Sequence, residues 1–514
     1  MPYLPKVEAD PRKFYMKLLE TSEDWESVFE PAMEIDVPEE RIADFCKHSI
    51  MREMITRIGD WPKYGVFEQT YCGPEYDAFQ DTYNSSVSVM LEWGFLDTAR
   101  RYIDNYLSYL TKDDGSIMFR GFEIAQGGRH LTMLAQYYNY TKDHALLLKH
   151  YKRIRTIIDN LLSLREEAKK LPKDDPAYGI IVGCSEIDNL LLSDPTPTLL
   201  PYFSSNVEVL RGFHDLGEVW ISIGKKLLRE DLVKEGEELK RESAEMKEDT
   251  YKSIEKSMLR DLVPPHLPAV AGAKEPYDKI KGVRLPISGR CYPEMLHSGV
   301  LTRDMVETII RYQEKHRGSR LGIPGGGRSA FRSYGYGYGM LQHDFVREFL
   351  LLYYAHMIHM HTRGTWTGCE GGNYDRSQPS GPYATPTQVT IPCLTKWMLV
   401  FDDPNSSTVW LARGVPRRWL EDGKTIRVKG APTKWGIISY EISSKMAQGR
   451  IKVELNLPEE GFGAAIHLRL RTPAKQKIQS VEVNGKTWMN FKPEEETVVL
   501  PADSKGQITI EVTT

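Results

Sequence analysis

Three features that would narrow the function at once are missing from the sequence. None of the six cysteines falls in a CxxC pair or in a Cys/His spacing of the kind that binds zinc. Basic residues are not in excess, because 71 Asp and Glu balance 67 Lys and Arg, so the charge pattern of a nucleic-acid-binding protein is absent. The longest apolar run, residues 349–354, is much too short to cross a bilayer. We therefore expect reduced thiols, no metal site or cofactor, and neither nucleic acid nor a membrane as partner.

The first residues, MPYLPKVEADPRK, also lack the charged segment and apolar stretch that together mark a secretory signal peptide. On this ground we expect a soluble, cytoplasmic chain. A secreted or periplasmic protein whose signal peptide had been removed would begin in the same way, so both compartments stay open.

Helical periodicity dominates the chain from about Val37 to Phe401. Apolar residues recur at the spacing of one helix face, and glycines and turns divide the region into about twelve segments. Asp97 and Asp143 are candidate N-caps. The predicted helices span residues 38–58, 79–94, 96–110, 127–139, 143–168, 204–223, 225–259, 292–298, 302–315, 329–337, 340–361 and 386–401.

After Asp403 the pattern changes to short segments rich in Val, Ile and Thr, which predict strands. These span residues 425–428, 436–443, 450–455, 465–471, 478–483, 496–500 and 507–512, and Asn484-Gly485 is typical of a tight hairpin turn. Because the strands follow the helices, a parallel βαβ sheet is disfavoured. We predict a mainly α protein with an N-terminal extension (1–36), an (α/α)6 toroid (37–402) and a C-terminal antiparallel β-sandwich (403–514).

The unusual residues are concentrated in loops between the predicted helices. Five stretches mix glycine, aromatic residues and carboxylates, namely residues 72–83, 119–130, 178–189, 322–339 and 364–375. Aromatic faces stack on sugar rings, carboxylates and Arg bind hydroxyl groups, and glycine lets the backbone approach a ligand. These loops therefore indicate a carbohydrate-binding cavity.

Two loop carboxylates are candidates for chemistry on a sugar. Cleavage of a glycosidic bond needs one carboxylic acid to protonate the leaving oxygen and a second carboxylate to activate water or to attack. Glu186 follows the fifth predicted helix, and Glu370 follows the eleventh in a Gly-rich turn. In a six-hairpin toroid these loops can converge on one end of the central cavity, so Glu186 and Glu370 are the candidate catalytic pair.

Several stretches resemble the six-hairpin glycosidases, the (α/α)6 group that includes glucoamylases, α-L-rhamnosidases and trehalases. They are YGIIVGCSEIDN at 178–189, the preceding DGS…RGFE segment, and TWTGCEGGNYD…PTQVTIPCLTKWMLVFDDP. The stretch from WLARGVPRRWLEDG to SVEVNGK is similar to the β-domain that often follows such toroids in bacterial glycosidases. The resemblance covers most of the chain as architecture, but it does not single out one family.

The resemblance implies that Glu186 is the general acid and Glu370 the general base, with inversion at the anomeric carbon. By analogy with closed toroid cavities it also implies exo action on an oligosaccharide or glycan. Asp188 or Asp375 could replace its neighbour in either role. Where many relatives carry Trp-Arg-Asp or Trp-Asp before the second helix, this chain has AFQD, so Asp81 is a candidate ligand for a sugar hydroxyl.

Other candidate substrate-binding residues lie around the same loops. One set could hold a sugar by hydrogen bonds or could form a buried network that braces two helices: Arg120, Glu123, Gln126, Arg129 and His130. Arg328, Arg332 and Tyr336 belong to a Gly/Tyr-rich segment that could be a lid or a subsite wall. Trp366 is a candidate stacking platform, with ordinary packing as the alternative.

Two other functions stay open. Uronate lyases also combine an α/α toroid with a β-domain, and they abstract a proton with Tyr or His. Tyr336, His297, His343 and Arg332 would form that constellation. A carbohydrate-binding protein that kept the fold without the chemistry is the second alternative. For the hydrolase, the lyase and the binding protein alike, we expect a glycan as partner.

Overall fold

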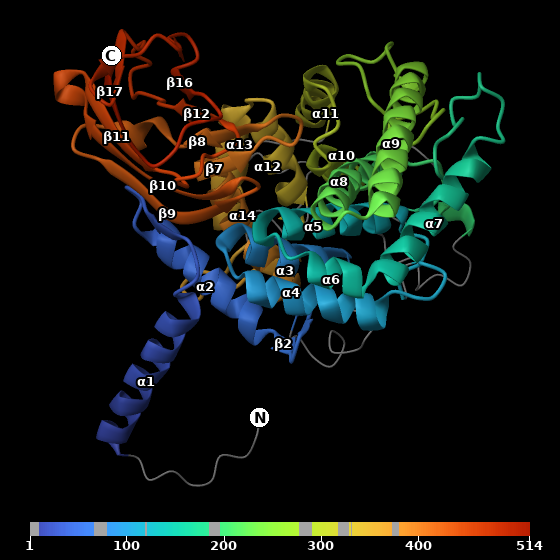
Figure 1. The fold of residues 1–514 in the computed structure, drawn as a ribbon, viewed down its shortest axis with the longest axis horizontal. Coiled ribbons are helices and arrows are strands. Elements are labelled where there is room, and N and C mark those ends of the chain that lie inside the picture. The colour runs from blue at the N-terminus through green and yellow to red at the C-terminus, as the bar shows by residue number, and fades with distance from the viewer. Residues whose placement is uncertain are drawn as a thin grey trace.

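The structure of the protein is a computed structural model, which describes residues 10–65, 80–118, 121–184, 196–276, 290–316, 328–329, 332–372 and 380–514. Figure 1 shows a helical body beside a β-domain drawn in orange and red, with the N-terminal helix α1 (Pro11–Phe29) extending away from both. No helix in the described part of the chain is long and apolar enough to cross a membrane.

From α2 onward, outer and inner helices alternate and form a toroid. Within the described residues the inner ring consists of α3 (Gln80–Trp93), α5 (Ile124–Thr141), α8 (Phe203–Leu227), α10 (Cys291–His297), α12 (Arg332–Gln342) and α14 (Thr385–Leu399). Each inner helix contacts the next, and α14 contacts α3, so the ring closes. The outer helices are α2 (Arg41–Ile55), α4 (Leu96–Asn105) with its π-helical continuation η3 (Tyr106–Leu110), α6 (His144–Lys149), α7 (Tyr151–Ala168), α9 (Glu230–Ser257), α11 (Arg303–His316) and α13 (Val346–His359).

The two ends of the toroid are built differently. Chain segments that leave an inner helix for the next outer helix are short turns, such as residues 94–95 and 228–229. Segments that enter an inner helix are long, such as residues 169–202 and 360–384. Because the inner helices run in the same direction, the long segments gather at their N-terminal ends, which we call the loop end. The opposite end faces the β-domain, and we call it the β-domain end.

Two sheets form the β-domain. The first has the order β1 (Glu34–Asp36), β9 (Thr425–Thr433), β10 (Gly436–Lys445), β11 (Arg450–Asn456), β17 (Gln507–Thr513), β13 (Ser480–Val483) and β14 (Lys486–Thr487). The second has the order β15 (Phe491–Lys492), β16 (Thr497–Leu500), β12 (Ala465–Arg469), β8 (Thr408–Leu411) and β7 (Val400–Asp402). Buried and exposed residues alternate strictly along β11, as expected for a strand with one face in the core.

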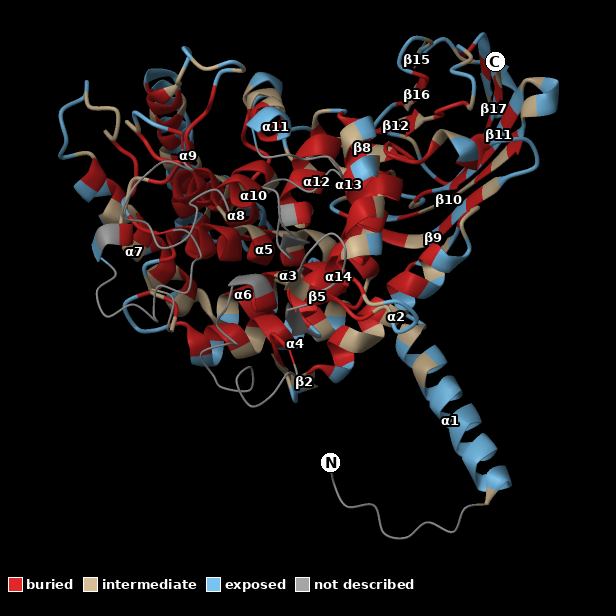
Figure 2. Cartoon of the chain, turned by 180° about the vertical axis from the view of Figure 1, so that it is seen from behind, coloured by how far each residue is buried: buried red, intermediate tan, exposed pale blue. Residues whose placement is uncertain are grey.

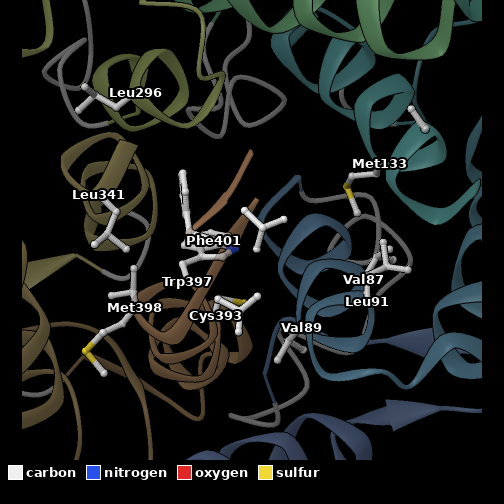
Figure 3. Close-up of a cluster of buried hydrophobic side chains, with 14 of the residues drawn as sticks. Val87, Val89, Leu91, Met133, Leu296, Leu341, Cys393, Trp397, Met398 and Phe401 are labelled. Atoms are coloured by element: carbon white, nitrogen blue, oxygen red, sulfur yellow. The ribbon is translucent and has the colours of Figure 1, made fainter. Parts of the chain in front are cut away.

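A continuous apolar core joins the inner helices to the β-domain. Figure 3 shows side chains of α3, α5, α10, α12, α14 and β7 in this core, with Trp397 and Phe401 near one another at the end of α14. Every residue of α14 is buried. Burial of one large apolar side chain contributes roughly 1.5–3 kcal/mol, so this helix is a main source of stability for the ring.

Among the described residues, each of the twelve helices predicted for residues 37–402 has a counterpart, including the eighth and tenth, which are α10 and α12. Helix α1 lies in the segment for which only an extension was predicted. The fifth predicted helix is divided at His150 into α6 and α7. Asp143 caps α6 as predicted, since its carboxylate accepts from Ala145 N at 2.9 Å. The prediction for Asp97 is wrong, because α4 already begins at Leu96 and Asp97 lies in its first turn.

The predicted strands are confirmed, and the Asn484-Gly485 turn joins β13 to β14 with both residues at positive φ. The sandwich departs from the expected antiparallel pattern at one pair, because β8 and β12 run parallel. Strand β1 lies in the N-terminal segment and pairs with β9, far along the chain. The described cysteines are free and buried, as expected, and Cys72 lies outside the described residues.

Candidate active site

Glu370 lies in a small sheet at the loop end. It belongs to β5 (Cys369–Gly372), which pairs with β4 (Arg328–Ser329) and β6 (Ser380–Pro382). The sheet joins the segment before α12 to the segment before α14. Cys369 is buried and Glu370 is half-buried. Because neighbouring side chains on a strand point to opposite faces, the Glu370 carboxylate points away from the core that holds Cys369.

The first turn of α14 anchors the strand that carries Glu370. The Gln388 side chain accepts a hydrogen bond from Gly368 N at 2.7 Å and donates to Trp366 O at 2.9 Å. Thr387 Oγ1 donates to Cys369 O at 2.8 Å. A Cβ atom on Gly368 would lie 2.8 Å from Gln388 N, so glycine is needed for this close approach. Glu370 is therefore carried by a backbone that is fixed to a rigid helix.

The turn before β5 is strained. Trp366 has a φ of 46°, in the left-handed region that costs a non-glycine residue roughly 1–3 kcal/mol and that is common at functional sites. Its half-buried ring packs against Phe45, at 5.4 Å between ring centroids, and against His48, at 5.9 Å. The ring of Trp366 thus already has partners on α2.

The segment that carries Glu186 begins beside the start of α5. Cys184 N donates to Phe122 O at 2.7 Å, and Gly183 and Leu200 exchange two backbone hydrogen bonds. These bonds hold residues 183–184 and 200 at the loop end. Glu186 and Asp188 lie outside the described residues, as do Arg120 and Asp375.

The four described residues of the predicted sugar-binding set at α5 are buried: Glu123, Gln126, Arg129 and His130. Gln126 donates to Tyr106 OH. The His130 ring lies 5.2 Å from the rings of both Tyr83 and Tyr106, and burial lowers its pKa to about 3. His130 is therefore neutral, and these contacts brace α3, η3 and α5 against one another.

Near the toroid axis, α5 and α8 bring charges of opposite sign together. A Cβ atom on Gly212 would lie 2.3 Å from Gly128 O, so the two helices touch through their backbones. Glu208 on α8 is consequently close to Arg129 on α5. Burial raises the pKa of Glu208 to about 7, although Arg129 and Arg211 act in the opposite direction. The His297 ring stacks on Tyr334 at 4.7 Å, and burial lowers its pKa well below the usual value.

The β-domain end holds a cavity of about 110 Å³ with a buried ion pair in its wall. Lys396 Nζ lies 2.9 Å from Glu92 Oε2, and Trp397 Nε1 donates to Glu92 Oε1 at 3.0 Å. Burial alone would lower the pKa of Lys396, but the carboxylates of Glu92 and Asp402 raise it. Tyr140 OH donates to both carboxylates at 3.3 Å. This network ties α3, α5 and α14 to β7.

The structure separates the residues of the proposed lyase constellation. Arg332 begins α12, whereas His343 follows the end of the same helix and contacts Leu301 O at 3.1 Å. The rise of about 1.5 Å per residue puts their backbones roughly 16 Å apart. Tyr336 is buried in the middle of this helix. The four residues therefore do not form one site.

The backbone of three further candidates is placed at the loop end: Asp81 in the first turn of α3, Arg328 in β4 and Arg332 at the start of α12. Further aromatic residues lie on this end besides Trp366, and none of them was an individual candidate from the sequence. Trp61, in the hairpin of β2 (Arg57–Ile58) and β3 (Trp61–Pro62), lies 5.6 Å from Tyr109 between ring centroids. Tyr109 and Phe122 are both exposed. Phe122 lies in the Gly-rich stretch 119–130, whereas aromatic character was the only local signal for Trp61 and Tyr109.

Comparison with known proteins identifies the fold. No protein-family model matches the sequence, and no curated protein matches it. The structure is similar to that of a protein assigned as a kojibiose phosphorylase from the human microbiome, with a TM-score of 0.51 and 10% identity over 98% of this chain and 68% of that chain. This similarity includes both the toroid and the β-domain, and it shows that the chain has the six-hairpin toroid fold.

Two further solved structures match less well. A glycoside hydrolase matches with a TM-score of 0.34 and 10% identity over 95% of this chain and 79% of that chain. An inactive variant of an α-1,6-mannanase of Salegentibacter sp. HEL1_6, in complex with α-1,6-mannotetrose, matches with a TM-score of 0.41 and 10% identity over 69% of this chain and 97% of that chain.

Proposed function

We propose that this chain is a glycoside hydrolase that cleaves an oligosaccharide or glycan at the loop end of its toroid. The observation that carries the proposal is the position of Glu370: a half-buried carboxylate on a short strand, after the eleventh helix of the ring, anchored by Thr387 and Gln388. A catalytic carboxylate has to be held in a fixed geometry, and this support provides it.

In the proposed reaction Glu186 donates a proton to the glycosidic oxygen while the bond from that oxygen to the anomeric carbon breaks. Glu370 removes a proton from a water molecule, whose oxygen forms the new bond from the opposite face of the sugar. The product has the inverted anomeric configuration. This mechanism needs about 6.5–9.5 Å between the two carboxyl groups, because the water must fit between one of them and the sugar.

The proposal extends to an exo mode of action. The network around Glu92 and Lys396 lies in the wall of the cavity at the β-domain end, and we propose that a chain end that enters at the loop end does not pass it. Exposed Tyr109 and Phe122 would stack on sugar units outside the catalytic position. Asp81, Arg328, Arg332 and Trp366 are the further proposed substrate ligands.

The test is substitution of each carboxylate in a screen against aryl glycosides and oligosaccharides. E186Q and E370Q should each lower kcat by about 10²–10⁴-fold without changing the thermal unfolding midpoint. Glu238→Gln, on the exposed face of α9, is the matched control and should keep full activity. Full activity in both E186Q and E370Q would overturn the assignment.

The products distinguish the other functions. A lyase would release an unsaturated sugar that absorbs ultraviolet light. An enzyme that uses phosphate in place of water would release a sugar phosphate only when inorganic phosphate is added. Glycan binding without any product would indicate a binding protein. Any of these three outcomes would replace the hydrolase proposal.

A further inference from the structure

Helix α1 exposes large apolar side chains to water. No residue of Pro11–Phe29 is buried against the described parts of the chain. The exposed fractions are 65% for Phe14, 67% for Tyr15, 55% for Leu18 and 60% for Leu19. Figure 2 shows α1 mostly in the colour of exposed residues and separate from the body of the molecule. Contiguous apolar surface of this kind is uncommon on a monomer and marks an interaction site.

The apolar residues form a stripe on one face, which the polar residues 20–24 interrupt. Phe14 and Leu18 are four residues apart, as are Tyr15 and Leu19, so these side chains share a face. After this interruption the stripe continues to Phe29, whose ring packs edge-to-face on Phe95 at 5.3 Å. The last turn of α1 is therefore fixed to the toroid, and the preceding turns carry the same stripe beyond the surface.

Local signals favour a helix here, but they do not explain its stability in water. Asp10 accepts from Arg12 N at 3.0 Å as an N-cap, and Pro11 occupies the first turn. Most helical stability in proteins comes from packing of an apolar face, and α1 has no buried residue. The stripe needs a surface to cover it.

The charges on α1 identify that surface. The first half carries Arg12, Lys13 and Lys17, and the second half carries Glu20, Glu23, Asp24 and Glu26. This distribution is unfavourable for a single helix, because the helix dipole favours acidic residues at the N-terminus and basic residues at the C-terminus. In an antiparallel pair of two α1 helices, however, each basic half lies against an acidic half.

We propose that α1 is a dimerisation arm that pairs antiparallel with α1 of a second copy of this chain. The two apolar stripes pack against each other around a two-fold axis, and the opposite charges lie along the edges of the pair. The arm leaves the toroid at the α2 side, so the proposal does not depend on any catalytic assignment. An isologous contact of this type closes on itself and gives a dimer.

The first experiment measures the mass of the full-length protein by sedimentation equilibrium. The wild type should be a dimer at micromolar concentration, and the double variant L18E/L19E should weaken the dimer by at least about 100-fold in Kd. Leu228→Glu, at the exposed turn between α8 and α9, is the control and should remain dimeric. The unfolding midpoint of the toroid should not change in L18E/L19E, because α1 has no buried residue.

The second experiment tests the antiparallel orientation. An acidic arm (R12E/K13E/K17E) and a basic arm (E20K/E23K/D24K/E26K) should each be monomeric alone, and an equimolar mixture should form a heterodimer. Self-association of either arm with wild-type affinity would overturn the proposal. A wild type that stays monomeric up to about 100 μM would also overturn it, as would a dimer that persists in L18E/L19E. If the wild type were monomeric and bound to phosphatidylserine vesicles, the proposal would be overturned, and the partner of α1 would be a lipid surface.

Discussion

The two ends of the toroid use buried and half-buried carboxylates in different ways. At the β-domain end, Glu92 is paired with Lys396 at 2.9 Å and accepts from Trp397, so its binding capacity is taken up within the protein. At the loop end, Glu370 is half-buried on a short strand, and Thr387 and Gln388 hold the backbone of that strand and of the turn before it. One end holds the fold together, and the other presents a carboxylate on a fixed support.

This difference follows from the connections between helices. Short turns leave no room for extra residues, so side chains of the inner helices and of β7 line the cavity at the β-domain end. Long segments at the loop end can carry strands such as β4, β5 and β6 without disturbing the ring. Function is common on loops that a rigid scaffold positions. The ends can therefore be tested separately, one by stability and the other by activity.

The largest expected effect on stability is at the β-domain end. Lys396→Met leaves Glu92 and Asp402 buried without their cation, which should lower the free energy of unfolding by about 3–5 kcal/mol. The control is Lys429→Met, because Lys429 and Glu34 form an exposed pair at 2.7 Å whose loss should cost about 1 kcal/mol or less. Urea unfolding of both variants checks the prediction, and equal losses would contradict the structural role of this end.

Substitution of one buried glutamine at each end compares the effects of the two ends on stability and activity. Gln388 holds the turn before Glu370, whereas Gln342 donates to Gly299 O at 2.7 Å at the β-domain end. Replacement of either by Leu should lower the free energy of unfolding by about 1–3 kcal/mol. Only Gln388→Leu should also lower kcat, by about 10²-fold, because it lets the strand of Glu370 shift. Steady-state kinetics would refute the distinction if Gln342→Leu lost as much activity.

The carboxylate near the toroid axis gives a prediction for pH. Burial raises the pKa of folded Glu208 to about 7 from its ordinary 4.5, while Arg129, Arg211 and His297 lie around it. Between these two values the folded state binds more protons than the unfolded state, so this group lowers the free energy of unfolding as pH rises from about 4.5 to about 7. Glu208→Gln should flatten the profile in that window. The exposed Glu238→Gln should leave it unchanged, and a Glu208→Gln profile equal to that of the wild type would refute the assignment.

The smallest expected effect concerns the aromatic rim of the loop end. Tyr109→Ala removes an exposed ring that pairs with Trp61, and it should weaken binding of longer oligosaccharides by about 0.5–1.5 kcal/mol. The effect should appear as a higher KM for long substrates and not for the shortest one. Met489→Ala, at an exposed site of the β-domain, is the control. If Tyr109→Ala changed KM equally for short and long substrates, Tyr109 would not be a substrate-binding residue.

Local sequence patterns were sufficient to predict the helix order from α2 onward and most strands of the β-domain, but not helix α1. Helical periodicity and the Asn484-Gly485 turn depend on residues that are near one another in the chain. Strand β1 could not be predicted, because its three residues become a strand only by pairing with β9. The parallel pairing of β8 with β12 is equally non-local.

The same distinction applies to the candidate site. Glu370 could be found because glycine and aromatic residues surround it in sequence. Glu208 has no such signal, since it lies inside a long helix and acquires its raised pKa only when the ring closes around it. The pair of Glu92 and Lys396 joins the first and last inner helices. The burial of Glu123 and His130 likewise depends on neighbours that come from other helices.

The most direct test of the account is a crystal structure of E370Q with an uncleaved oligosaccharide. We predict a sugar chain at the loop end, with its scissile bond between residues 186 and 370 and about 6.5–9.5 Å between the two carboxyl or amide groups. Sugar bound in the cavity beside Lys396 or on the β-domain, with none at the loop end, would contradict it.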